Sequence, residues 1–227
     1  MPLSSTTDRG TLLLFDLDDP RTGNKIMNSI YFPAITNRIG NGVYDHNSIK
    51  KTIRDDFMIY IYNDYGGTHT TSLAAAYHLK QLPQSERKLT SEEILNVKYF
   101  NKLTKKESGK LIFRGTDEEG NSVYTMGHKR EKLVVPALKE LTLLLEEKFH
   151  FNEKIVFSNT SPTVPIAMSI GGYLSRALKI DFIGVPLLII GTKQCCDNIF
   201  RLVENTKQIG KAANGEKVII IENEKYK

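Results

Sequence analysis

The strongest pattern in this chain is the alternation of short apolar runs with helical stripes. It begins at Met58, where the apolar run 58–62 leads through a polar turn into a helical pattern over 70–82 that ends before Pro83. The same order of strand, polar turn and helix recurs twice further along the chain, as is typical of a parallel sheet. We expect strands over 154–158, 186–190 and 217–221 and helices over 164–178 and 193–207.

Three further elements are expected between these units. The stretch 90–93 is a capping pattern, with Ser91 or Thr90 as N-cap, for a helix that ends near Phe100. The runs 111–114 and 122–126 flank a polar, glycine-containing turn and predict a β-hairpin. A leucine stripe at helical spacing follows Pro136. The predicted fold is therefore an α/β fold with three layers and a mostly parallel sheet, Rossmann-like or P-loop-like, with a β-hairpin insertion.

Residues 1–57 differ from the rest of the chain. They are rich in Asn, Asp, Thr and Gly, and only the stretch 11–17 has the pattern of a strand. We expect a weakly structured N-terminal appendage over 1–57 and an α/β domain over 58–227. An upstream translation artefact, with Met58 as the true start, is the alternative; mass spectrometry of the native N-terminus would decide between them.

Composition narrows the range of partners. The chain has 227 residues and a net charge of +5, spread over mixed-sign stretches, so nucleic acid is not an expected partner. No apolar run approaches the roughly 18 residues that cross a bilayer, and the N-terminus lacks the pattern of a secretory signal. The two cysteines are neighbours, Cys195 and Cys196, and offer no disulfide framework. We expect a protein of the reducing cytoplasm.

The turn after the first strand is the best candidate site. Gly66 and Gly67 permit unusual backbone angles and a close approach of a ligand. The following helix N-terminus offers unpaired N–H groups and a partial positive charge, which favour an anion such as a phosphate. We expect the ligand to be bound by Gly66, Gly67, Thr68, Thr70, Thr71 and the planar cation of Arg114.

The same turn contains two candidate catalytic residues. His69 is predicted to be a neutral general acid or base that Asp64 orients, although a buried structural histidine is the alternative. The turn lacks the lysine of a Walker A loop and the spacing of a dinucleotide fingerprint, so these motifs do not identify a nucleotide and the cofactor is unknown. The hydroxyl-rich stretches 159–163 and 191–192 follow other strands and either complete a composite pocket or act as helix caps.

The remaining polar residues are weaker candidates. His128 lies beside two cations and could add positive charge to the same cleft, whereas His78 is interpreted as structural or surface-exposed. The acidic stretch 117–119 is expected to be a solvated hairpin tip. No cluster has the ligand spacing of a metal site. The neighbouring cysteines are expected to be packed on a helix rather than reactive.

From Met58 to Lys207 the chain resembles a bacterial family known as domain of unknown function 3189. The resemblance depends on the stretches 62–69, 111–117, 161–163, 170–176, 182–184 and 191–192. It implies a fold unit and its boundaries but no reaction. Two functional hypotheses therefore stand side by side. The first is binding of a small anionic or phosphorylated ligand, with or without catalysis. The second is a non-catalytic protein–protein interaction module in a bacterial regulatory or developmental assembly.

Overall fold

The computed structural model describes residues 57–151, 153–213 and 215–227. The appendage expected over 1–57 lies outside the described residues except for Phe57. The α/β domain expected to begin at Met58 is described from its first strand onward.

A five-stranded sheet forms the centre of the domain. Its strands are β1 (Met58–Asp64), β2 (Ile112–Thr116), β3 (Ser122–Gly127), β4 (Lys154–Asn159) and β5 (Val218–Ile221). They lie in the order β2-β3-β1-β4-β5. β1 pairs in parallel with β3 and β4, β4 pairs in parallel with β5, and only β2 is antiparallel to its neighbour. The predicted mostly parallel sheet with a hairpin insertion is confirmed.

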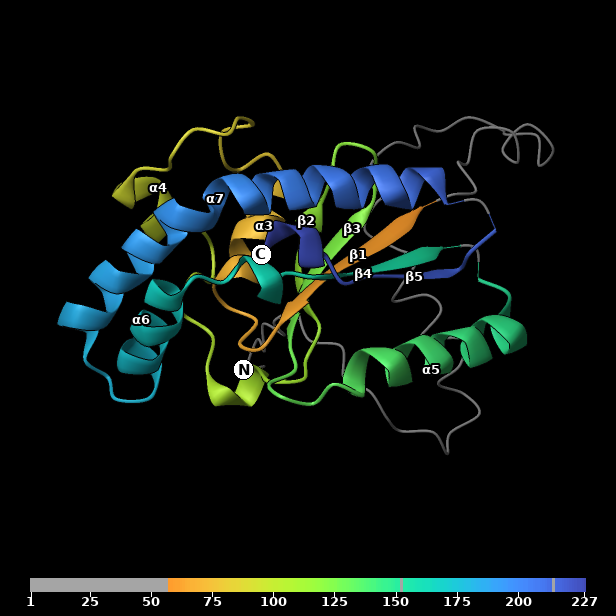
Figure 1. Cartoon of the computed structure of the whole chain (residues 1–227). Coiled ribbons are helices and arrows are strands. Elements are labelled where there is room, and N and C mark those ends of the chain that lie inside the picture. Colours follow the sequence, from red (N-terminus) through yellow and green to blue (C-terminus); the bar gives the residue numbers. More distant parts are fainter. Residues whose placement is uncertain (1–56, 152, 214) are drawn as a thin grey trace, which may run out of the picture. The chain divides into compact units, whose positions relative to one another are not determined.

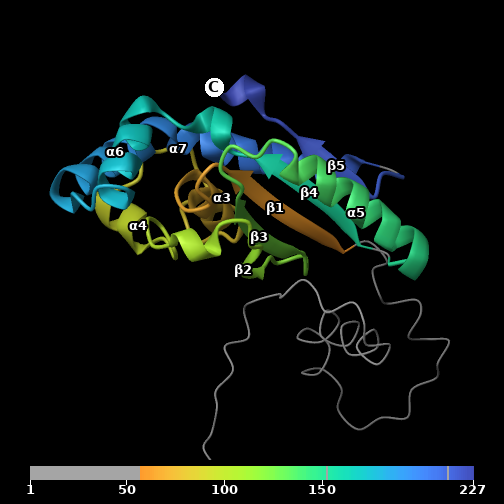
Figure 2. The same ribbon diagram turned by 90° about the horizontal axis from the view of Figure 1, so that it is seen from below.

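The helices cover both faces of the sheet and make the predicted three layers (Figures 1 and 2). They are α3 (Thr70–His78), α4 (Ser91–Asn96), α5 (Val134–Phe149), α6 (Ile166–Arg176) and α7 (Asp181–Ala212). α5 lies on one face and α3 and α7 on the other (Figure 2). The alternation of β1 explains this arrangement, because Tyr60 and Tyr62 pack towards α3 and α7 while Ile61 packs with Phe157 and Val135 on the α5 side.

The strand order reverses between β1 and β4. From β1 the chain passes through α3 and the hairpin to β3 on one side, and from β3 it passes through α5 to β4 on the other. In open α/β sheets, ligands bind outside the carboxyl ends of the strands at such a reversal. The turns that follow Asp64 and Asn159 both lie at this edge of the sheet.

One expected strand is wrong. The stretch 186–190 belongs to the 32-residue helix α7, and Gly191 and Thr192 lie inside that helix rather than in a turn. A short apolar run cannot by itself distinguish a strand from a buried helix segment. The helical spacing of the buried residues in α7 resolves the ambiguity: Gly184, Leu188, Gly191, Cys195, Ile199 and Leu202.

Small residues in α7 allow it to pack closely against α6. A Cβ atom on Gly184 would lie 2.7 Å from the Ser175 nitrogen, and one on Gly191 would lie 2.6 Å from the Met168 nitrogen. A proline near the start of a helix is tolerated better than one deep inside it, and Pro186 is the sixth residue of α7.

Because residues 191–192 lie inside α7 and not in a turn at the end of a strand, they do not contribute to the composite pocket that was expected.

The cysteines lie within α7 rather than at its start. Both side chains are free and buried. Burial raises the pKa of the Cys195 thiol to about 12, which leaves it protonated and unreactive at neutral pH. This agrees with the expectation that the pair is packed on a helix.

Two helix boundaries also differ from expectation. α3 ends at His78 rather than near Leu82, because Lys80 adopts a left-handed conformation with φ of 54°. The helix expected over 164–178 corresponds to α6, which is shorter at both ends and is preceded by a separate 3-10 turn over Ser161–Thr163. The start of α4 is as expected, since Thr90 and Glu93 form a reciprocal capping box.

Candidate functional site

The turn between β1 and α3 is organised around the carboxylate of Asp64. This residue ends β1 and is only 5% exposed. Oδ1 accepts a hydrogen bond from the backbone N–H of Gly67, and Oδ2 accepts one from the hydroxyl of Thr70 at 2.7 Å. A carboxylate near a helix N-terminus is favoured by the helix dipole. The chain therefore already places one negative group of its own in the turn.

The two glycines have different roles. Gly67 has φ of 69°, and a Cβ atom there would lie 2.6 Å from the Gly127 nitrogen. The close approach that Gly67 permits is thus between the β1 and β3 turns. Gly66 is exposed, and a Cβ atom there would have its nearest contact at 3.9 Å, so its side of the turn remains open.

The first turn of α3 is buried, and its backbone N–H groups lack hydrogen-bond acceptors among the described residues. Thr70, Thr71 and Ser72 are at most 1% exposed, and the N-cap residue His69 makes no side-chain cap. Among the described residues, no acceptor is found for the backbone N–H groups of Thr70, Thr71 and Ser72. The Thr71 hydroxyl is likewise buried without a hydrogen-bond partner there. Buried helix termini normally have partners, so this group of donors is unusual.

The turn after β4 meets the turn after β1, as the sheet order requires. The hydroxyls of Thr160 and Thr70 lie 2.9 Å apart, and the Thr160 backbone N–H donates to the Asn63 carbonyl at 2.8 Å. Two of the three expected hydroxyl-rich stretches are therefore brought together at one edge of the sheet.

His69 is held by Asn101 and makes no described hydrogen bond to Asp64. Its Nε2 donates to Asn101 Oδ1 at 3.1 Å, and its ring packs edge-on against Phe100. Burial lowers the pKa of His69, opposed by the hydrogen bond to Asn101 and the charge of Asp64. The neutral imidazole then has Nδ1 as a proton acceptor, since Nε2 holds the hydrogen.

A chain of polar side chains continues beyond Asn101. Its Nδ2 donates to Ser175 Oγ at 2.7 Å, and Ser175 Oγ donates to Asp181 Oδ1 at 2.5 Å. The Asn101 carbonyl also accepts a hydrogen bond from Arg176 at 2.9 Å. His69 is therefore oriented by residues of α6 and α7 that lie far from it in the sequence, which the sequence reasoning missed.

Thr68 holds the turn in place. Its hydroxyl donates to the Tyr99 carbonyl at 2.9 Å, and its carbonyl accepts from the Asn101 N–H at 3.2 Å. Thr68 is 3% exposed. Its hydroxyl proton is thus used to fix the loop after α4.

Arg114 lies at the irregularity between β2 and β3 and binds three neutral acceptors. Its guanidinium donates to Thr125 at 2.7 Å, the Lys98 carbonyl at 2.9 Å and Ser72 at 2.9 Å. It also lies 4.6 Å from the centre of the Tyr99 ring. Arg114 is 8% exposed, and burial lowers its pKa to about 10, so it stays charged at neutral pH. Its contact with Ser72 places this buried cation beside the first turn of α3.

His128 follows β3 directly and joins the same edge of the sheet. Its backbone N–H donates to the Asp64 carbonyl at 3.0 Å. Its Nδ1 is buried and has no hydrogen-bond partner among the described residues. The expected addition of positive charge from His128 to the cleft stays a prediction.

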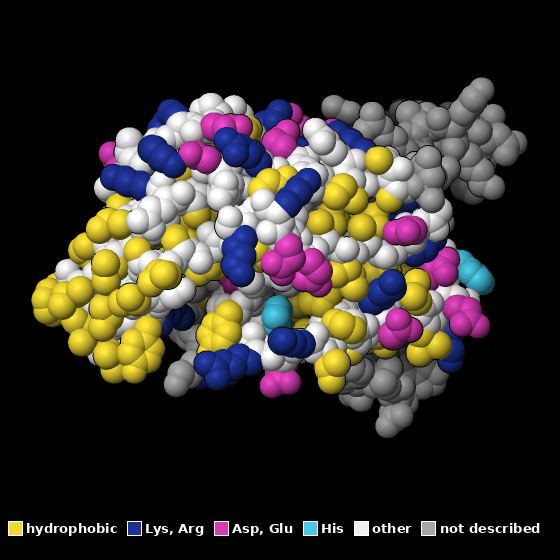
Figure 3. All heavy atoms as spheres, in the orientation of Figure 1, with side chains coloured by type: hydrophobic (Ala, Val, Ile, Leu, Met, Phe, Trp, Pro, Cys, Tyr) yellow, Lys and Arg dark blue, Asp and Glu magenta, His cyan; other side chains and the backbone are white. Residues whose placement is uncertain are grey.

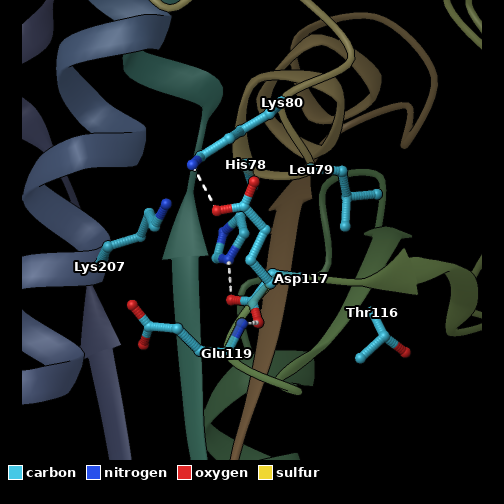
Figure 4. Close-up of a pocket in the computed structure, with 8 residues that line it drawn as sticks. His78, Leu79, Lys80, Thr116, Asp117, Glu119 and Lys207 are labelled. Atoms are coloured by element: carbon cyan, nitrogen blue, oxygen red, sulfur yellow. Dashed lines mark hydrogen bonds and ion pairs between the residues drawn. The ribbon is translucent and has the colours of Figure 1, made fainter.

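A second polar cluster lies at the opposite end of α3 (Figure 4). The Tyr62 hydroxyl lies 2.7 Å from His78 Nδ1, and His78 Nε2 lies 3.1 Å from Asp117 Oδ2. Asp117 also accepts hydrogen bonds from Glu119 and Asn121. His78, Asp117 and Glu119 border a cavity of about 110 Å³ towards which Lys207 also points. His78 is structural, one of the two expected alternatives.

Burial affects the protonation of this cluster. Burial lowers the pKa of His78, opposed mainly by the hydrogen bond to Asp117. Burial alone would raise the pKa of Asp117, but hydrogen bonds from His78 and Asn121 hold it well below its usual range. Asp117 is therefore a carboxylate held in place by hydrogen bonds. Glu118 and Glu119 are the exposed part of the hairpin tip, where they form ion pairs with Lys80 and Lys211.

Neither a membrane-spanning helix nor a metal-binding cluster is found among the described residues. No helix there has both the length and the apolar character needed to cross a membrane. No group of three or more His, Cys, Asp or Glu side chains in that part of the chain is arranged to hold a metal ion.

Comparison with known proteins gives one match. The family model described as "Protein of unknown function (DUF3189)" matches residues 59–208, which include the β1–α3 turn and both polar clusters. No curated protein and no solved structure matches the chain.

Proposed function

Given that the chain belongs to the DUF3189 family, we propose that it binds a small anionic ligand, such as one with a phosphate group, at the N-terminus of α3. The ligand would accept hydrogen bonds at the edge of the sheet where the strand order reverses. Cytoplasmic action fits the two free, buried cysteines.

The observation that supports this proposal is the buried first turn of α3. The N–H groups of Thr70, Thr71 and Ser72 and the Thr71 hydroxyl have no acceptor among the described residues. An unsatisfied buried donor costs on the order of 1–3 kcal/mol. A ligand oxygen that accepts several of these hydrogen bonds would recover that free energy, and the helix dipole would favour a negative charge on it.

The charges around the turn limit where an anionic ligand can bind. Arg114 lies on one side of the first turn through its contact with Ser72, and Asp64 lies on the other through its contact with Thr70. The carboxylate repels an incoming anion, so the ligand binds beside Asp64 and not in place of it. The exposed Gly66 offers the approach from solvent.

His69 is the side chain best suited to exchange a proton with the bound ligand. Its Nε2 is fixed by Asn101, which leaves Nδ1 as the basic atom of a neutral ring. In this proposal Asp64 is not the group that orients His69; it organises the turn through Gly67 and Thr70. Asn101 takes the orienting role.

Isothermal titration with inorganic phosphate and a panel of phosphorylated metabolites tests the proposal. Thr71→Val removes the unpaired hydroxyl at constant shape, and Thr192→Val is the matched control because it also removes a buried, unpaired hydroxyl, in α7. We expect a saturable site whose affinity falls at least tenfold in Thr71→Val and is unchanged in Thr192→Val. Absence of binding to every ligand, or equal loss in both variants, would refute it.

The alternative function is a non-catalytic protein–protein interaction module in a bacterial regulatory or developmental assembly. One observation favours it: seven large apolar side chains are exposed on the α6–α7 hairpin. A partner that co-purifies from native lysate at a fixed ratio, and is lost on Phe182→Glu but retained on Leu133→Glu, would support this function. Retention of the partner by both variants would exclude this surface.

A further inference from the structure

The α6–α7 hairpin presents an apolar surface that the anion site does not use. We define the α6–α7 face as the exposed side chains Ile166, Ile170, Tyr173, Leu178, Phe182, Ile183 and Ile190. Their exposed fractions run from 43% for Ile183 to 81% for Phe182. Figure 3 shows apolar side chains gathered at this end of the molecule.

The helical spacing places these residues of α6 and α7 on the outer side of each helix, and Leu178 lies in the loop between the two helices. In α6, Ile166, Ile170 and Tyr173 recur at intervals of four and three residues, while Met168, Gly171 and Ser175 are buried. In α7, Phe182 and Ile190 are eight residues apart, while Gly184, Leu188 and Gly191 are buried. The close α6–α7 packing therefore uses the inner stripes and leaves both outer stripes without a partner in the described part of the chain.

The area of the face matches one side of a stable interface. A large apolar side chain exposes on the order of 200 Å² in an extended chain, so seven side chains at these fractions present about 800 Å². A specific interface of standard size takes about 800 Å² from each partner. The largest apolar patch of a typical monomer covers about 300–600 Å².

The charge pattern of the face permits an identical partner. Between Ile166 and Thr192 the only charged residues are Arg176, Lys179 and Asp181. A surface with so few charges neither selects a partner of opposite charge nor repels a second copy of itself. It also lacks the rich Lys and Arg content of a helix that binds at an anionic membrane surface.

We propose that the α6–α7 face is the interface of a homodimer. A two-fold axis would place one helical hairpin against the other and build a four-helix bundle, in which the face meets its own copy. Tyr173 and Phe182 are the aromatic anchors of this interface. The dimer does not depend on the anion site, so either proposal can fail alone. It competes with the alternative function, because a second copy on the α6–α7 face leaves no room there for a different partner protein.

Sedimentation velocity on the full chain over a concentration series tests the proposal. The expected species has twice the 25.7 kDa mass of one chain. The double variant Ile166→Glu with Phe182→Glu places two charges in the face and should weaken the dimer at least a hundredfold. The matched control is the double variant Leu133→Glu with Leu144→Glu, whose apolar side chains are 76% and 50% exposed elsewhere; it should remain dimeric.

Several results would overturn the proposal. One is a chain that stays monomeric at concentrations up to about 100 μM, since a standard-size interface gives tighter association than that. Another is a dimer that the face variant leaves intact. Cross-links within a monomer between residues 1–56 and the face would assign it to the chain's own N-terminal segment. Binding of phosphatidylcholine–phosphatidylglycerol vesicles by a monomer, lost in the face variant alone, would assign it to a lipid surface.

Discussion

Asp64 Oδ2 accepts a hydrogen bond from Thr70 Oγ1 at 2.7 Å, so a buried carboxylate lies beside the first turn of α3. The same carboxylate binds the Gly67 N–H. It therefore satisfies one backbone donor of the turn and contributes a negative charge where the helix dipole favours one. The backbone N–H groups of Thr70 and Thr71 have no acceptor among the described residues, and these are the donors that the proposed ligand would use.

Replacement of Asp64 by Asn should strengthen anion binding. The amide keeps nearly the same shape and an oxygen for the Gly67 N–H, but it removes the charge that repels the ligand. Two unit charges about 4 Å apart interact by a few kcal/mol near a protein surface, so we expect phosphate affinity to rise at least tenfold. Glu118→Gln is the control, because it removes the same charge from the exposed hairpin tip. Weaker phosphate binding in a folded Asp64→Asn protein would contradict this account of the turn.

Gly67→Ala should destabilise the protein strongly, whereas Gly66→Ala should be nearly neutral. At Gly67 the backbone is left-handed and a Cβ atom would lie 2.6 Å from Gly127, while at Gly66 the nearest atom is 3.9 Å away. We expect Gly67→Ala to lower the free energy of unfolding by about 2–4 kcal/mol and Gly66→Ala to lower it by less than about 1 kcal/mol. Urea denaturation measures both. Equal effects of the two variants would show that the contact between the β1 and β3 turns is not close.

Arg114→Lys should also reduce stability. The guanidinium binds three acceptors on different elements and stacks on Tyr99, and an ammonium group cannot reproduce that fork. We expect a loss of about 2–3 kcal/mol by chemical denaturation. Arg87→Lys is the control, since Arg87 is half exposed and solvent screens its ion pair with Glu93, so we expect almost no change in stability. An Arg114→Lys variant as stable as the original protein would exclude a structural role for the Arg114 guanidinium group.

Stability should fall as the pH is lowered from neutral. The pKa of His78 is lowered in the folded protein, so the unfolded chain takes up the proton first as the pH falls through the ordinary value of 6.5. His69 acts in the same direction. Asp117 has a lowered pKa as well, and its contribution is present above the ordinary value of 3.8 and is lost below it.

Urea titrations between pH 8 and pH 5 measure this effect. His78→Asn keeps an acceptor for Tyr62 but has no titratable ring, so we expect a lower stability at pH 8 and a shallower loss on acidification. The remaining slope reports His69. A stability that rises between pH 8 and pH 5, or an unchanged slope in His78→Asn, would contradict the assignment of a neutral His78.

The sequence predicts the parts of the fold that depend on local pattern. The β1 strand, the capping box at Thr90 and the hairpin at 112–127 follow from alternation and turn residues, and the structure confirms them. The strand predicted over 186–190 is wrong because four consecutive apolar residues show neither the period of a strand nor that of a helix. The helical stripe of α7 becomes visible only when Gly184 and Cys195 are counted with it.

At the candidate site, too, only the features that depend on residues close together in the sequence could be predicted. The location of the β1–α3 turn was predictable, because strand, glycines and helix are adjacent in the sequence. The partners of its side chains were not, since Asn101 lies 32 residues from His69 and Thr160 lies 90 residues from Thr70. The pair of His78 and Asp117 was missed for the same reason, although the Asp-x-x-Gly-Asn turn at residues 117–121 indicates a carboxylate that binds its own backbone.

The most direct test of the central claim is a phosphate titration followed by the backbone amide resonances of an isotope-labelled full chain. We expect saturable shifts at the amides of Thr70, Thr71 and Ser72, which are strongly reduced in Thr71→Val and unchanged in Thr192→Val. Shifts confined to exposed lysine-rich stretches, with these three amides unmoved at saturating phosphate, would contradict it.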